Sequence, residues 1–141
     1  MIKEEIAPGI VVYSEVIANG ETLYQDIEEG MASANIQWQQ ASVKETDEPK
    51  VNTNTRDTHT LGVNYLGRID DSTPASMSEF LLLNLNNIFF ESFDPIEKDY
   101  MSQYGIFTES HDSYGILKYG KGQKFTNHID DHKDYHRRVS T

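Results

Sequence analysis

The feature that most constrains the fold is an amphipathic segment that starts near residue 73. Thr73 and Pro74 form a strong helix start, because a threonine hydroxyl can cap a helix and proline is favoured at the first helical position. Apolar side chains then recur at helical spacing and form a stripe of Met77, Leu81, Leu85 and Ile88, widened by Phe80 and Phe89. We expect this helix to be the main packing element of the core.

The same pattern indicates where the helices end and where another begins. Asp94-Pro95 should end the long helix near Phe93 and start a short second helix, which stops at Gly105. Earlier in the chain, Asn19 can cap a helix that begins near Glu21. The apolar face of that earlier helix would be Leu23, Ile27 and Met31.

Runs of β-branched and aromatic residues predict short strands at 9–13, 36–43, 113–119 and 124–130, with another beginning at 137–141. Trp38 would anchor the second of these strands, and the glycines of residues 120–122 permit a turn or bulge. The polar segment 45–60 is interpreted as a long loop, either a binding loop or lid or simply unstructured, with a strand near 60–65. The chain is therefore expected to be α+β, with helices first and a β-rich end.

Composition narrows the function classes. A length of 141 residues fits a single domain, 1–141, and the absence of cysteine excludes disulfides, thiolate metal sites and a cysteine nucleophile. A formal net charge of -11 argues against binding to nucleic-acid phosphates. The longest apolar run is residues 80–83, too short to span a membrane, and the N-terminus lacks the layout of a signal peptide. We therefore expect a cytoplasmic protein with no membrane association.

The residues with the clearest chemistry are His128 and Asp130. In a strand, side chains two positions apart point to the same face, so this imidazole and this carboxylate would project together. They could supply two of the three ligands in a facial triad of two histidines and one carboxylate, which leaves metal positions open. The triplet alone is weak evidence, since such triplets often occur by chance and an exposed polar strand end is the more common explanation.

The residues around the triplet add to this pattern. The order is Tyr119, Gly122, Phe125, the His128-x-Asp130 triplet and Arg137, followed by the strand-like residues 139–141. Over residues 116–141 this order resembles the prolyl 4-hydroxylase-like family of oxygenases that depend on Fe(II) and 2-oxoglutarate. The resemblance implies a double-stranded β-helix, or jelly roll, with N-terminal helices and strands leading into it.

The resemblance also implies roles for individual residues. His128 and Asp130 would bind Fe(II), and Tyr119 would lie beside the cosubstrate 2-oxoglutarate and hydrogen-bond its carboxylate. Arg137 matches a basic position near the substrate entrance and is the expected catalytic residue. The resemblance also implies ascorbate as an accessory cofactor. The expected substrate is a peptide or protein, in which prolyl residues are one class of target. Without the resemblance, Tyr119 is a strand aromatic and Arg137 a solvated charge.

The chain departs from the family pattern in one respect. A jelly roll has about eight strands in two sheets, and in the family a second metal histidine and a basic residue for 2-oxoglutarate follow several strands after the triplet. Only 11 residues follow Asp130 here. We therefore expect this chain to hold the first part of the barrel and to be inactive on its own. It would be a truncated, split or incomplete form of a longer protein.

Two other interpretations remain open. His128, His132 and His136 are spaced by four, so a helix would align them into a zinc-type site, supported by Asp131 or Asp134. The chain could also be a non-catalytic interaction module or a fragment, whose open sheet edges favour pairing with another chain. The sequence leaves the oligomeric state undetermined.

Overall fold

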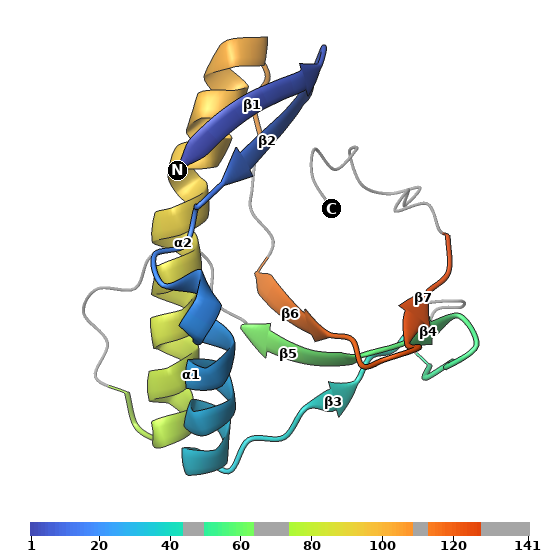
Figure 1. Ribbon diagram of the computed structural model, residues 1–141. Coiled ribbons are helices and arrows are strands. Elements are labelled where there is room, and N and C mark those ends of the chain that lie inside the picture. Colours follow the sequence, from blue (N-terminus) through green and yellow to red (C-terminus); the bar gives the residue numbers. More distant parts are fainter. Residues whose placement is uncertain (44–49, 64–73, 109–112, 128–141) are drawn as a thin grey trace. The chain divides into compact units, whose positions relative to one another are not determined.

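The computed structural model describes residues 1–43, 50–63, 74–108 and 113–127 (Figure 1). The chain divides into two compact units, one formed by Met1–Trp38 and Leu61–Ile116 and the other by Gln39–Thr60 and Leu117–Thr141. The described residues form two helices and three small sheets, none of which is closed. The expected mixture of helices and strands is therefore confirmed, while the jelly roll remains a prediction.

Helix α1 (Gly20–Ser33) begins where the sequence indicated, but its N-terminus is capped differently. Asn19 is the N-cap, yet it has left-handed backbone angles (φ 59°) and its side chain makes no capping hydrogen bond. Its backbone carbonyl instead accepts hydrogen bonds from the amides of Thr22 and Leu23, at 3.0 and 3.2 Å. Asparagine is one of the few residues that tolerate this backbone conformation. The predicted position is confirmed and the predicted mechanism is wrong.

Helix α2 (Met77–Tyr104) is the long helix expected from the apolar stripe, although it starts later than predicted. Ser76 is the N-cap, and its hydroxyl accepts from the amide of Glu79 at 3.2 Å. The Glu79 carboxylate accepts in turn from the amide of Ala75 at 2.6 Å. This reciprocal capping satisfies free amides at the helix start. Pro74 therefore precedes the helix, and Thr73 lies outside the described residues.

The predicted break at Asp94-Pro95 is wrong, because α2 continues through Pro95 without interruption. Proline has no amide hydrogen and normally costs about 3 kcal/mol inside a helix. The turns after Pro95 are held by contacts to the N-terminal hairpin, described below, and these offset that cost. The helix ends as predicted at Gly105, which takes left-handed angles (φ 64°) and donates its amide to the Met101 carbonyl.

The core of the first unit lies between the two helices and parts of β5 (His59–Val63) and β6 (Tyr114–Lys118). Its buried members are Ile27, Met31, Leu61, Val63, Leu85 and Phe89. Phe89 and Tyr114 meet edge to face, with ring centroids 5.5 Å apart. Two residues of the predicted stripe, Met77 and Phe80, are exposed instead.

The N-terminus forms an antiparallel hairpin of β1 (Ile2–Ala7) and β2 (Ile10–Ser14). Only β2 was expected from the sequence. The hairpin is attached to the end of α2 by polar contacts: Asp99 accepts from the ammonium of Lys3 and the hydroxyl of Tyr13, both at 2.5 Å. The hydroxyl of Tyr104 donates to Glu5 at 2.7 Å. Burial and then the Asp99 hydrogen bond raise the pKa of Tyr13 to about 12.

The remaining strands are short. β3 (Gln39–Gln40) pairs antiparallel with β5, which lies between β3 and β6 in one sheet. β4 (Arg56–Asp57) pairs antiparallel with β7 (Lys124–Phe125). The strand expected at 36–43 is therefore much shorter than predicted, and the expected loop at 45–60 contains a strand. The strand expected at 113–119 is confirmed by β6.

None of the helices in the described ranges combines the length and the apolar character needed to cross a lipid bilayer.

Candidate functional site

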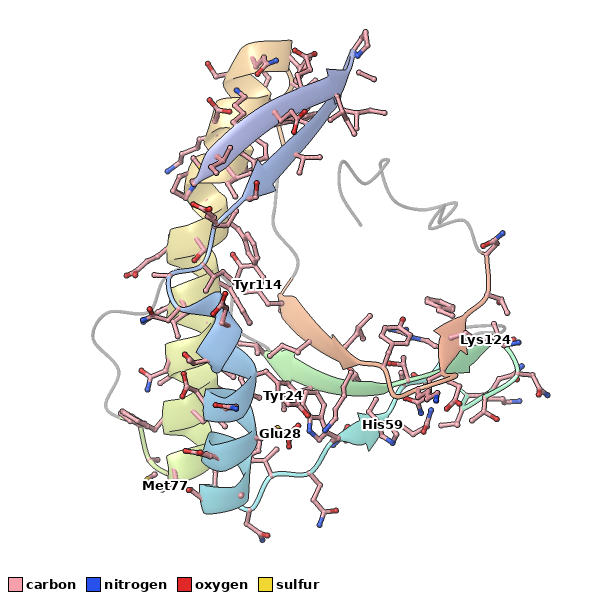
Figure 2. All side chains as sticks on the ribbon, in the orientation of Figure 1. Tyr24, Glu28, His59, Met77, Tyr114 and Lys124 are labelled. Carbon is pink, nitrogen blue, oxygen red and sulfur yellow. The ribbon has the colours of Figure 1, made fainter. Side chains whose placement is uncertain are left out.

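The strand that precedes the predicted metal ligands is β7, and it is held against β4. Arg56 lies opposite Phe125 and Asp57 opposite Lys124 in this antiparallel pair. Figure 2 labels Lys124 on β7. The pairing extends one residue further, since Thr126 donates its amide to the carbonyl of Thr55 at 2.9 Å. The Thr126 hydroxyl donates to the same carbonyl at 3.2 Å. The backbone is thus extended and paired up to two residues before His128.

A tight turn sets the start of β7. Gly122 has a positive φ of 84°, a conformation that favours glycine. The amide of Gln123 donates to the Gly120 carbonyl at 3.0 Å, and the Gln123 side chain accepts from the Gly120 amide at 2.6 Å. The Gln123 amide group also donates to the Asp57 carboxylate at 3.1 Å. Gln123 therefore closes the turn and ties it to β4.

Arg56 is the other polar anchor of this strand pair. Its guanidinium lies 4.7 Å from the centre of the Phe125 ring, within the range of a cation–π contact. One terminal nitrogen donates to the Ser42 carbonyl at 3.3 Å. Its Nε is buried and has no hydrogen-bond partner among the residues that the structure describes. This side chain fixes the aromatic residue at the end of β7.

Tyr119, the predicted 2-oxoglutarate contact, directly follows β6 and its side chain is 45% exposed. Thr58 positions the end of that strand: it is fully buried, and its hydroxyl donates to the Lys118 carbonyl at 2.7 Å. A buried hydroxyl needs such a partner because leaving it unsatisfied is costly. The backbone beside Tyr119 is therefore held in place, while Tyr119 itself is exposed.

The other predicted site residues, His128, Asp130 and Arg137, lie outside the described residues, as do His132 and His136 of the rival zinc-type site. Tyr119 is the only predicted site residue in the described ranges, and the mutual arrangement of the site stays a prediction. Within the ranges that it does describe, no group of three or more histidine, aspartate or glutamate side chains could hold a metal ion. Fe(II) binding remains a prediction from the sequence.

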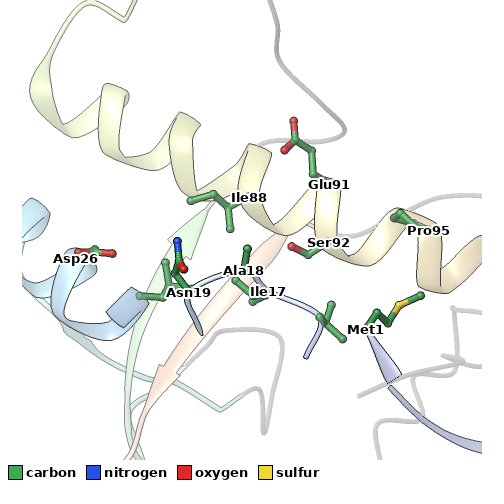
Figure 3. A pocket seen from close by; sticks show the side chains of 11 residues that line it. Met1, Ile17, Ala18, Asn19, Asp26, Ile88, Glu91, Ser92 and Pro95 are labelled. Carbon is green, nitrogen blue, oxygen red and sulfur yellow. The ribbon is translucent and has the colours of Figure 1, made fainter. Parts of the chain in front are cut away.

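A pocket of about 560 Å³ lies in the first unit and holds none of the predicted site residues (Figure 3). Ile17, Leu23 and Ile88 supply apolar lining, and Asn19, Asp26, Glu91 and Ser92 are the polar residues around it. Pro95 and Met1 complete one side. The pocket contains no cluster of groups that could perform chemistry, and we assign it no function.

Sequence reasoning missed three residues that shape the strand before His128: Arg56, Asp57 and Gln123. The first two lie in the polar segment that was expected to be a loop, and neither alternation nor helical spacing marks them. Gln123 contacts Asp57 across 66 positions of the chain. Only the pairing of β4 with β7 brings them together.

Comparisons of the chain with protein-family models, curated proteins and solved structures found no match.

Proposed function

We propose that this chain carries the first part of an Fe(II)- and 2-oxoglutarate-dependent dioxygenase of the prolyl 4-hydroxylase-like type, with a jelly-roll fold. The observation that carries the proposal is the ordered series Tyr119, Gly122, Phe125, His128-x-Asp130 and Arg137. No single member is specific, and the support comes from the order of the whole series, which resembles that of the family.

The described part of this series is compatible with the proposal. A strand ends just before Tyr119, a glycine with positive φ stands in the turn, and β7 then leads toward His128. A strand–turn–strand unit of this kind is what the resemblance requires before the ligand pair. Thr58, Arg56 and Gln123 hold the unit by contacts that do not involve the ligands.

The donor set fits the proposed metal. A neutral imidazole and a carboxylate are two of the three ligands in sites that bind Fe(II) and keep positions open for other molecules. When bound, the iron would use O2 as the oxidant: one oxygen atom would enter succinate as 2-oxoglutarate loses CO2, and the other would enter the hydroxylated substrate. In this chain His128 and Asp130 would hold it, the Tyr119 hydroxyl would orient the cosubstrate carboxylate, and Arg137 would lie at the substrate entrance.

Metal titration of the 141-residue chain tests the ligand pair without requiring turnover. Binding of Mn(II), a redox-stable substitute for Fe(II), can be followed by electron paramagnetic resonance of the free ion. We expect H128A and D130A each to weaken binding by at least about tenfold, since even second-shell changes cost that much at metal sites. The matched control is H132A, which removes a nearby histidine and should leave the affinity unchanged.

The same titration separates the proposal from the alternatives. If H132A and H136A weaken metal binding as much as H128A while D130A has no effect, the histidine-stripe site is correct. Absence of any Mn(II) binding that depends on His128 would contradict the oxygenase proposal. The chain alone should not release succinate from 2-oxoglutarate. An extended polypeptide that supplies a further histidine should do so, and should develop a visible charge-transfer band with Fe(II) and 2-oxoglutarate under anaerobic conditions.

A further inference from the structure

The hairpin of β1 and β2 has an unusual distribution of side chains. The side that faces α2 carries Lys3, Glu5 and Tyr13, which make polar contacts to the helix. Alternation along a strand sends the neighbours of these residues to the opposite side. An antiparallel sheet normally packs its apolar side on the protein and turns its polar side to water. In the hairpin, Val11 lies opposite Glu5 on the inner side and is half-buried, but the other inner contacts are polar, and Ile10 and Val12 on the outer side are exposed.

We define the outer face of the hairpin as Ile2, Glu4, Ile6, Ile10, Val12 and Ser14. Cross-strand pairing places Ile2 beside Ser14 and Glu4 beside Val12; the register shifts between Glu5 and Ala7, so that Ile6 lies at a bulge and Ile10 pairs with Ala7. The apolar members are all exposed: Ile2 by 54%, Ile6 by 58%, Ile10 by 55% and Val12 by 44%. Single exposed apolar side chains are ordinary, but four of them on one two-stranded hairpin concentrate apolar surface there.

The hairpin does not need this face for its own attachment. Its position on α2 is set by Asp99, by the Tyr104–Glu5 hydrogen bond, and by the hydroxyl of Tyr100, which donates to the Gly9 carbonyl at 2.7 Å. No hairpin residue belongs to the buried core of the first unit. The outer face is therefore available to bind another molecule, while the inner face holds the hairpin on α2.

The charge on the outer face indicates which kind of binding partner could cover it. Glu4 is its only charged residue, it lies beside Val12, and no basic side chain pairs with it among the described residues. Covering this face with a purely apolar surface would bury an unpaired carboxylate, which is costly. A second copy in a two-fold interface would bring a second Glu4 to the same patch. An anionic membrane would repel a chain with a net charge of -11.

We propose that the outer face of the hairpin is a docking site for a protein or peptide segment that presents apolar side chains together with a lysine or arginine. The apolar side chains would cover Ile6, Ile10 and Val12, and the basic group would pair with Glu4. This interaction uses only residues in 2–14 and none of the residues of the proposed metal site.

The test uses the full 141-residue chain and a short fluorescein-labelled peptide of alternating leucine and lysine, followed by fluorescence anisotropy at physiological salt. The I10T/V12T variant removes apolar surface but keeps β-branched residues, so the strand is retained. E4Q removes the charge alone. Both should weaken peptide binding by at least about tenfold, a loss typical of a residue central to an interface.

Matched controls come from other exposed sites. L117T on β6 removes a comparably exposed apolar side chain, and E21Q on α1 removes an exposed carboxylate. Neither should change the affinity. Equal binding of a serine–lysine peptide would reveal simple charge attraction and overturn the proposal. So would undiminished binding by I10T/V12T and E4Q with their circular dichroism unchanged.

The other occupants give distinct results. Self-association in analytical ultracentrifugation that I10T/V12T abolishes, without peptide binding, would assign the face to a second copy. Co-sedimentation with phosphatidylglycerol vesicles that the same variant abolishes would assign it to a membrane. Either result would contradict the proposed basic and apolar protein partner.

Discussion

Replacement of Gly30 by alanine tests how closely α1 approaches α2. A Cβ atom at position 30 would stand 2.7 Å from Cδ1 of Leu81 and 3.3 Å from its Cδ2. The first distance is too short for two carbon atoms, so the leucine side chain would have to move. Glycine at this position therefore permits the contact between the two helices.

Two opposing effects determine how much G30A changes the free energy of unfolding. Alanine is favoured over glycine in a helix interior by about 1 kcal/mol. Overpacking a filled interface costs about 1–3 kcal/mol. The atoms approached are the end of a flexible, half-buried leucine, so we take a cost of about 2 kcal/mol within that range. G30A should therefore lower the free energy of unfolding by about 1 kcal/mol, the difference between the two effects.

Urea unfolding followed by circular dichroism measures this free energy, and G20A is the matched control. A Cβ at position 20 would meet only the Cβ of Ile17, at 3.9 Å, an ordinary contact. G20A should therefore be neutral or stabilise by roughly 0.5 kcal/mol. L81A should cost less in the G30A background than in the native chain, with a coupling of at least about 0.5 kcal/mol. If G30A proves as stabilising as G20A, the close approach of the helices is refuted.

Two further predictions concern hydrogen bonds. T58V should lower the free energy of unfolding by about 1–3 kcal/mol, because it leaves the Lys118 carbonyl without its buried donor. Urea unfolding measures this loss. The control T60V changes a half-buried threonine nearby and should lower the free energy of unfolding by less. Because the folded state raises the pKa of Tyr13 from 10.0 to about 12, the stability that this residue adds is complete below pH 10.0 and is lost as the pH rises toward 12. Y13F should be less stable than the native chain below pH 10.0 and converge with it near pH 12, and a gap independent of pH would contradict this reasoning.

Local chemistry accounts for the features that were predicted correctly. Ile27 and Met31 are buried because their spacing puts them on one face of α1. This spacing can be recognised without knowing which element packs against that face. Gly105 ends α2 because glycine accepts left-handed backbone angles. The turn at Gly122 follows from the same property. The strand and turn around Tyr119 could therefore be placed before any contact was known.

Features that depend on distant residues were missed or mistaken. Pro95 should have ended α2 by its own chemistry, but the helix beyond it gains partners from a hairpin about ninety positions earlier, as the hydrogen bond from Tyr100 to Gly9 illustrates. Strand β1 lacks the usual pattern because its polar residues face the protein. Near the candidate site, Gln123 finds Asp57 only through strand pairing.

The residues of this chain by themselves indicate the two helical segments, the turns and a candidate ligand pair, His128 and Asp130, because backbone preference and side-chain chemistry act over a few positions. Tertiary structure alone decided that α2 runs unbroken, that β4 supports β7, and that the hairpin turns its apolar side outward. Each of these depends on contacts between segments far apart in sequence, whose free energy outweighs a local preference of a few kcal/mol at most.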